Sequence, residues 1–337
     1  MKRVFVIFTA VFTMTTFTFG QNQGLKFATR YYDAADKWVA FDKKAEDTTY
    51  MVGFIYIDEQ AGFTFDFDSR VVVTNNGLEK LPRDFESSIK ARLSQNTANV
   101  AVLSDEEVKQ LNLPEVPDWL KYYKENENKN SYLVRIGFLY NSVGASHNAI
   151  EPLLKVYEKE PHFQGLEFEL AYAFNATKQF DKAIPVLNKA IENNPKNFWY
   201  YRELGFALKN QNKLDEAEKV YLQGIKLSSD KSQKAEMAIN MAQSYFQVKN
   251  KAKFNEWAKL TKKYADKPEK YDSKIIEEKK SIGEEFVIVE QAVYLYCPNG
   301  YGNTKLHNTF LETKLKVRAT TRNLKTANKL LQIAKET

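Results

Sequence analysis

The sequence predicts a multidomain protein with a small N-terminal α+β domain, a central all-α array of repeated helix pairs and a C-terminal α/β fragment. Three observations support this fold class. A pattern recurs every 34 residues between positions 130 and 263, apolar residues alternate between positions 50 and 74, and the composition changes again after Gly283. The chain of 337 residues has room for two or three domains, and its net charge of +6 favours no particular class of partner.

The first 20 residues have the composition of a secretory signal peptide. Two basic residues precede an uncharged run, and Gly20 is small enough for a signal peptidase. We therefore expect an exported protein whose mature form begins near Gln21 in a bacterial periplasm. The alternative is an uncleaved membrane anchor, because the run approaches spanning length. The one cysteine, Cys297, permits no intrachain disulfide and is expected to be a buried strand residue.

Residues 22–129 are expected to form the small α+β domain. Its expected elements are a helix over 27–41, a hairpin with strands over 50–57 and 63–74, a short helix over 85–93 and a strand over 99–103. Ser104, with Glu107 three residues later, predicts a capping box and hence the start of another helix. The acidic residues of the hairpin are interpreted as a solvated strand face, so no metal site is predicted.

The repeat is defined by small and bulky residues that return in the same register. Small residues let two helices approach closely, and bulky ones fill the space between them. The small positions are Gly137, Ala171 and Gly205 on the first helix and Ala149, Ala183 and Ala217 on the second; the bulky positions are Tyr140, Phe174 and Leu208. Pro161 and Pro195 follow two of the second helices, where a fixed φ and a missing N–H prevent continuation.

This spacing and these residue types resemble the tetratricopeptide repeat, a helix-turn-helix unit that stacks into a superhelix. The array is expected over 130–270, with three clear units and a fourth that is displaced by about three residues and carries Met241, Tyr245 and Trp257. In that family, positions two, five, nine and twelve of each unit line a groove. The resemblance therefore implies a peptide-binding groove lined by Phe138, Asn141, Phe168, Tyr172, Asn175, Trp199, Arg202, Phe206 and Lys209.

Aromatic residues and arginine commonly anchor interfaces, and asparagine can pair with a peptide backbone. We expect Arg202 to pair with an acid or carbonyl of the ligand, and we expect the helix to tolerate Arg202→Ala and Tyr172→Ala. The alternative is that some of these aromatics pack between units. The set differs from the Lys and Asn residues with which family members clamp a C-terminal carboxylate, because Phe168 and Arg202 occupy fifth positions.

Residues 283–337 are expected to fold as two strands over 287–289 and 292–296, a glycine turn, a helix from Thr304 and a second helix over 324–334. The run from Tyr294 to Gly302, followed by residues 304–323, resembles the end of the bacterial family called domain of unknown function 1697. The family's larger N-terminal part has no counterpart in this chain, which suggests a fusion near Ser281. About 50 residues bury too little apolar surface alone, so this segment must dock elsewhere or be poorly ordered.

The leading functional hypothesis is an exported, non-catalytic scaffold that binds a protein or peptide in its concave groove. No nucleophile, base and orienting residue can be assembled from the three histidines, so neither catalytic residues nor a cofactor are predicted. One alternative is an enzyme of unknown reaction in the N-terminal domain. The other is a phosphate or nucleic-acid surface on the basic C-terminal segment, with Lys305, Arg318 and Arg322, although export argues against nucleic acid.

Overall fold

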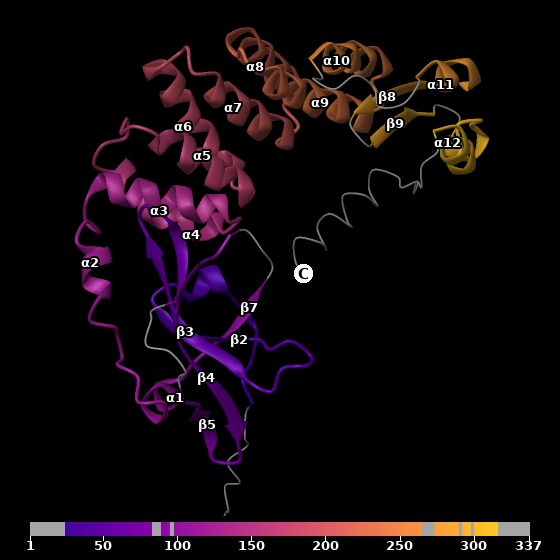
Figure 1. Cartoon of the computed structure of the whole chain (residues 1–337). Coiled ribbons are helices and arrows are strands. Elements are labelled where there is room, and N and C mark those ends of the chain that lie inside the picture. Colours follow the sequence, from indigo (N-terminus) through magenta and orange to yellow (C-terminus); the bar gives the residue numbers. More distant parts are fainter. Residues whose placement is uncertain are drawn as a thin grey trace, which may run out of the picture. The chain divides into compact units, whose positions relative to one another are not determined.

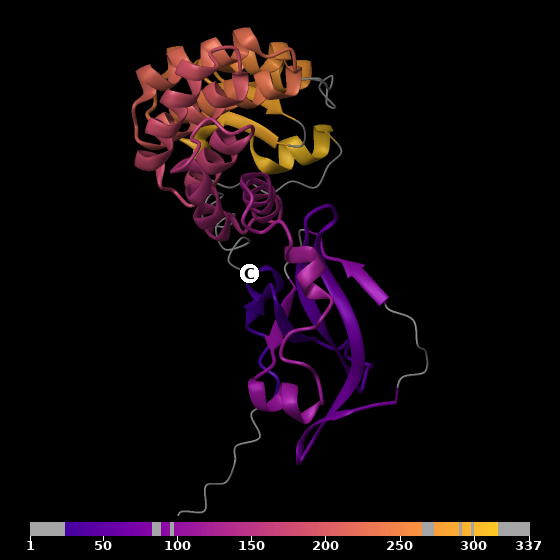
Figure 2. The same ribbon diagram turned by 90° about the vertical axis from the view of Figure 1, so that its left-hand side faces the viewer.

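The computed structural model describes residues 24–82, 89–94, 98–264, 273–289, 292–297 and 300–315. The chain divides into two compact units. A strand-rich unit holds most of the described residues up to Asp118, and a helical unit holds those from Trp119 onward together with 57–64 and 92–94. Figures 1 and 2 show these elements from two directions. No helix within the described ranges is long and apolar enough to cross a bilayer.

The strand-rich region is built on one sheet in the order β1-β7-β2-β3-β4-β5, with β6 paired to β4. The strands are β1 (Thr29–Arg30), β2 (Lys37–Phe41), β3 (Tyr50–Asp58), β4 (Gly62–Thr74), β5 (Gly77–Lys80), β6 (Ile89–Arg92) and β7 (Asn99–Val102). The predicted β3–β4 hairpin and the strand at 99–103 are confirmed. The capping box is also confirmed, because Ser104 and Glu107 exchange hydrogen bonds at the start of α1 (Asp105–Gln110).

The helix predicted over 27–41 is wrong. The segment forms β1, the 3-10 turn η1 (Tyr31–Ala34) and β2, and Asp36 adopts a left-handed φ of 60° that no continuous helix allows. β2 pairs with β3 and β7. Its residues Trp38, Val39 and Ala40 are buried in succession, so both faces of this strand are covered. A strand covered on both faces has a continuous apolar run, which sequence periodicity does not separate from a buried helix.

The short helix predicted over 85–93 is also wrong where it is described. Residues 89–92 form β6, a strand that pairs with β4. All four residues are exposed, and Ile89 is 45% exposed. The apolar residues that predicted a helix in this segment therefore do not mark a buried helical face.

The helical unit contains four consecutive helix pairs after the short α2 (Leu120–Lys124). The pairs are α3 (Asn130–Ser142) with α4 (Ser146–Tyr157), α5 (Leu166–Ala176) with α6 (Phe180–Asn193), α7 (Phe198–Asn210) with α8 (Leu214–Leu227), and α9 (Lys231–Gln247) with α10 (Lys251–Tyr264). One core of buried residues runs through all four pairs. The predicted pairing is confirmed, including the fourth, displaced pair.

The small residues of the repeat lie where helices touch. A Cβ added at Gly137 would lie 2.5 Å from the Leu153 side chain, and one added at Gly205 would lie 2.5 Å from the Tyr221 ring. Ala171, the small residue at the same position of the second unit, is fully buried. The second helix therefore approaches the first only because these positions carry no larger side chain.

The C-terminal described residues form α11 (Ser273–Lys279), the antiparallel strands β8 (Glu285–Val289) and β9 (Ala292–Tyr296), the turn η2 (Tyr301–Asn303) and α12 (Asn308–Leu315). The two predicted strands are confirmed. The helix expected from Thr304 begins only at Asn308. Leu306, which precedes it, is fully buried in a small cluster with Ile276 and Leu311. The second predicted helix, over 324–334, lies outside the described residues.

This segment docks on the last helix pair, as its small size requires. The ring of Tyr296 lies 6.1 Å from the rings of both Phe246 and Phe254, and β8 contacts α10. Cys297, expected to be buried, is only half-buried and follows β9 directly; burial raises the pKa of its thiol.

Candidate functional site

The first helices of successive pairs contact one another, α3 with α5, α5 with α7 and α7 with α9. They form the inner layer of the array, and Figure 1 shows α7 and α9 on the inner side of α8 and α10. The residues at positions two, five, nine and twelve of each unit lie on these inner helices, as predicted. The structure divides them into residues that hold neighbouring units together and residues whose side chains are accessible.

Asn141 and Asn175 belong to the first group, so the expectation that they pair with a peptide backbone is wrong. Both are buried, with 6% and 4% of their surface exposed. The Nδ2 atom of Asn141 donates to the backbone oxygen and Oε2 of Glu169 at 3.0 and 2.8 Å. Asn175 makes the same two contacts with Glu203 at 3.1 and 2.9 Å. Each asparagine therefore joins its unit to the next.

Arg202 also has its partners within the chain. Its Nε and Nη2 donate to Oε1 of Glu203 at 3.0 and 2.6 Å, and its Nη1 donates to Gln233 at 2.8 Å. Its guanidinium carbon lies 4.5 Å from the centroid of the Trp199 ring. Only 14% of the Arg202 side chain and 7% of the Glu203 side chain are exposed. The arginine predicted to anchor a ligand is instead one half of a buried ion pair.

The accessible group contains the aromatic residues at position nine. Phe138 is 40% exposed and Tyr172 is 36% exposed, although both lie on the inner helices of a packed array. Phe206, at the same position of the third unit, is half-buried, 6.2 Å from Phe180 and 4.7 Å from the ammonium of Lys209. Burial lowers the pKa of Lys209.

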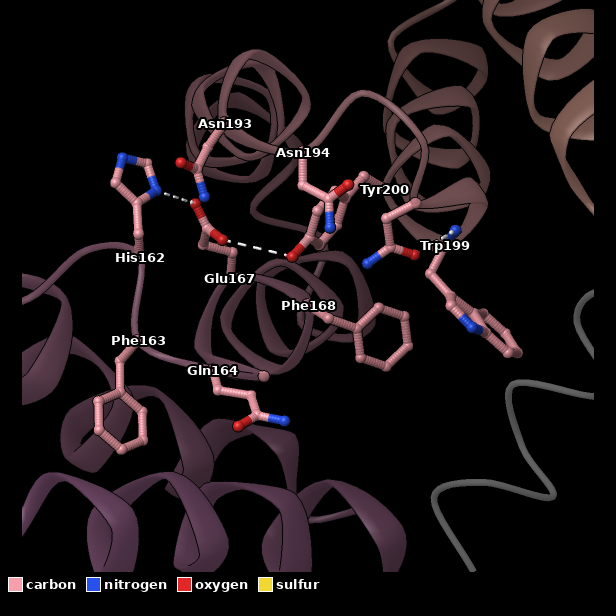
Figure 3. Close-up of a pocket in the computed structure, with 11 residues that line it drawn as sticks. His162, Phe163, Gln164, Glu167, Phe168, Asn193, Asn194, Trp199 and Tyr200 are labelled. Carbon is pink, nitrogen blue, oxygen red and sulfur yellow. Dashed lines mark hydrogen bonds and ion pairs between the residues drawn. The ribbon is translucent and has the colours of Figure 1, made fainter.

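Phe168 and Trp199 connect this face to a pocket. Their rings pack edge to face at 5.6 Å, and both line a cavity of about 390 Å³ between the α4–α5 and α6–α7 connections. Figure 3 shows Phe168 and Trp199 on the right of this pocket. Its other residues are mainly amides, imidazole and aromatic groups: His162, Phe163, Gln164, Gly165, Glu167, Asn193, Asn194, Asn197 and Tyr200.

A polar chain runs along the opposite side of the pocket. Nδ1 of His162 lies 2.7 Å from Oε1 of Glu167, and the Tyr200 hydroxyl donates to Oε2 of the same carboxylate at 3.3 Å (Figure 3). Glu167 is only 3% exposed. Burial, and then the charge of Glu167, raise the pKa of the Tyr200 hydroxyl. These contacts join the α4–α5 connection, through His162, to α5 and α7.

The sequence did not predict this pocket, although one signal was present. The positions equivalent to Glu167 in the neighbouring units hold Leu133 and Tyr201, so a carboxylate at 167 interrupts an otherwise apolar register. A buried acid at such a position requires polar partners, which His162 and Tyr200 supply.

The predicted anion-binding residues are not brought together among the described residues. Lys305 is exposed, whereas Arg318 and Arg322 lie outside the described ranges. Within those ranges no group of His, Cys, Asp and Glu side chains has the arrangement of a metal site.

Two overlapping segments, residues 168–197 and 186–219, match sequence families described as tetratricopeptide repeats. They coincide with α5, α6, α7 and the start of α8. The chain contains tetratricopeptide repeats. The prediction from the 34-residue pattern is thereby confirmed in the region where the pattern is strongest.

Several solved structures resemble part of the chain. A MamA structure labelled MSR-1 is 23% identical, with 43% of this chain and 84% of that chain covered and a TM-score of 0.37. MamA from Desulfovibrio magneticus RS-1 is 17% identical, with 43% and 80% covered and a TM-score of 0.38. A thermophilic tetratricopeptide repeat protein of Thermus thermophilus, TTC0263, is 18% identical, with 44% and 80% covered and a TM-score of 0.37. No curated protein matches the chain.

Proposed function

We propose that the repeats bind a protein or peptide segment on the inner face formed by α3, α5 and α7. One observation carries the proposal: aromatic side chains occupy position nine of successive units, and those of Phe138 and Tyr172 remain substantially exposed. Large side chains that remain exposed at equivalent positions of adjacent inner helices offer apolar surface for a ligand to cover. Phe206 extends this row into the third unit.

The pocket beside Phe168 and Trp199 supports the same function. Peptide ligands present backbone amides and side chains together, and amide-lined cavities of several hundred cubic ångströms next to aromatic rings suit such groups. The side-chain amides of Gln164, Asn193 and Asn194 have no hydrogen-bond partner elsewhere among the described residues. They are therefore available to a ligand that extends from the inner face into the pocket.

The experiment compares matched aromatic and apolar truncations in the full chain. Tyr172→Ala and Phe138→Ala remove the exposed inner rings, whereas Leu222→Ala removes an apolar side chain that is 46% exposed on the second helix α8. Partners captured from a periplasmic extract are identified, purified and titrated against each variant. We expect Tyr172→Ala to weaken binding roughly thirtyfold, as for a residue worth about 2 kcal/mol, and Leu222→Ala to have no effect.

The proposal is wrong if the two inner variants bind as the native chain does. Thermal melting of the same samples separates lost contacts from lost folding, because both side chains are exposed and their truncation leaves the core intact. We also propose that the chain acts outside the cytoplasm, on the strength of its N-terminal composition. N-terminal sequencing of the fractionated protein tests this: a chain beginning near Gln21 supports export, and an intact Met1 contradicts it.

A further inference from the structure

Two glutamates of the inner face stand in equivalent positions and allow a direct comparison. Glu169 follows Phe168 on α5, and Glu203 follows Arg202 one unit later on α7. Each accepts hydrogen bonds from the buried asparagine of the preceding unit, at its backbone oxygen and at Oε2. The local frame of the two carboxylates is therefore the same.

The second oxygen distinguishes them. Oε1 of Glu203 receives two hydrogen bonds from the Arg202 guanidinium, which also stacks on Trp199. The chain thus shows how this frame accommodates a cation: one carboxylate oxygen binds an amide, the other binds a guanidinium, and an aromatic ring covers the guanidinium face.

Glu169 has the amide but no cation. Phe168 occupies the place that Arg202 has in the next unit, and no Lys or Arg among the described residues forms an ion pair with the Glu169 carboxylate. Burial raises the pKa of Glu169, since Asn141 alone does not offset the loss of hydration. A partly buried carboxylate without a cation is an unfavourable arrangement that a cationic ligand would relieve.

An accessible ring stands one helical turn from this carboxylate on the same helix. Tyr172 follows Glu169 by one helical turn, is 36% exposed, and lies 6.2 Å from the Phe168 ring. The other exposed ring, Phe138, already makes a cation–π contact within the chain, since the Arg135 guanidinium carbon lies 4.9 Å from its centroid. Tyr172 is therefore an exposed inner ring one helical turn from a carboxylate that forms no ion pair among the described residues. Arg202 is a nearby cation whose guanidinium carbon lies 5.8 Å from the Phe168 ring, but its charge is already paired with Glu203.

We propose that Glu169 and Tyr172 together bind an arginine or lysine side chain of the segment held on the inner face. This inference rests on the proposed function and specifies the chemistry of the partner: a basic residue whose guanidinium or ammonium donates to Glu169 and lies against the Tyr172 ring. Arginine fits better than lysine, because its planar group donates and stacks at once, as Arg202 does one unit away.

The test measures binding of labelled peptide pools to the full chain by fluorescence anisotropy. Each pool is twelve residues long with random flanks, and its central residue is fixed as arginine, as citrulline, which has the same shape without the charge, or as glutamate. The chain variants are Glu169→Gln, which keeps the amide contact but removes the charge, and Glu192→Gln, a matched change at an exposed position of α6. Melting curves confirm that each variant is folded.

We expect the native chain to bind the arginine pool about tenfold more tightly than the citrulline pool, at the lower end for a charge-assisted hydrogen bond. Glu169→Gln removes this preference by weakening only the arginine pool, and added salt reduces it. Glu192→Gln leaves it unchanged.

Equal binding of the arginine and citrulline pools, or a preference that survives Glu169→Gln, overturns the inference. If the citrulline or glutamate pool binds and Tyr172→Ala weakens it, the inner face binds peptides without a cation site, so the proposed function stands and this inference fails. If the native chain binds none of the pools, the inference is overturned. The proposed function is then judged separately, by titrating the captured partner against the Tyr172→Ala and Phe138→Ala variants.

Discussion

Arg202→Ala is expected to lower the stability of the repeats rather than to act only on binding. Truncation removes both hydrogen bonds to Oε1 of Glu203 and the stacking on Trp199. The Glu203 carboxylate, with 7% of its side chain exposed, stays buried with the amide of Asn175 as its remaining polar partner. Breaking a buried ion pair from one side costs about 3 kcal/mol or more, because the other charge is left without compensation.

For a helical region of this size, 1 kcal/mol corresponds to a shift of about 2–4 °C in Tm, so Arg202→Ala should lower the Tm by roughly 6–12 °C. Circular dichroism at 222 nm follows the melt. Arg202→Met combined with Glu203→Gln removes both charges and should recover much of the loss, since the buried Glu203 carboxylate no longer lacks a cation. The second carboxylate near Arg202, Glu236 at 3.7 Å, has a side chain that is 48% exposed and can be hydrated. Tyr172→Ala is the control, because its ring is exposed on the same face.

An Arg202→Ala variant that melts as the native chain does would refute this reasoning. It would mean that the Arg202–Glu203 contacts contribute no net stability, and it would restore the sequence-based expectation that Arg202 is free to anchor a ligand. A double variant no more stable than Arg202→Ala would show that the loss comes from packing on Trp199 and not from the unpaired carboxylate.

Three further outcomes are expected. Gly205→Ala should cost about 1–3 kcal/mol by overpacking, because its Cβ would lie 2.5 Å from the Tyr221 ring, whereas Gly24→Ala, with no atom within 4 Å, should melt unchanged. Glu169→Gln should raise the Tm at pH 7 more than at pH 4. Because the pKa of Glu169 is raised in the folded state, the folded state binds its proton more tightly than the unfolded state does, and the stability of the native chain falls as the pH rises above 4.5. Glutamine does not titrate, so the variant lacks this fall. A chain ending at Lys270 should keep a cooperative helical melt, since each repeat contacts only its neighbours, and a loss of helical signal at 25 °C would contradict this.

The helix pairs could be predicted because close packing between two helices restricts which residue types fit at their contact. Only small residues fit at Gly137 and Gly205, and the pattern returns whenever the same contact is made. Segment 27–41 could not be predicted in this way, because a strand buried on both faces has no alternation to reveal it. The hairpin at 50–74 was recognisable because Phe63, Phe65 and Phe67 alternate with polar residues, and because 50–57 is rich in β-branched and aromatic residues and precedes a turn.

The sequence predicted which helices carry the proposed groove residues, but not the contacts that these residues make within the chain. The register places Asn141, Tyr172 and Arg202 on the inner helices, and the structure confirms that placement. The register does not show that the carboxylates of Glu169 and Glu203 reach back to the preceding unit, because this contact joins residues 28 positions apart through side-chain conformation alone. Three residues that the register presents as equal candidates for ligand binding therefore differ: Asn141 and Arg202 bind partners within the chain, whereas Tyr172 is exposed.

The division between stacking and binding positions follows from the repeat itself. Position twelve and the residue after position five are used in pairs to join units, as in Asn141 with Glu169 and Asn175 with Glu203. Position nine is not needed for that contact, so its side chain is free to vary and to meet a ligand. Where the fifth position supplies a cation, as Arg202 does, the carboxylate is neutralised within the chain; where it supplies Phe168, the charge is left for a partner to neutralise. A single exchange at position five thus converts a stabilising contact into a candidate binding site.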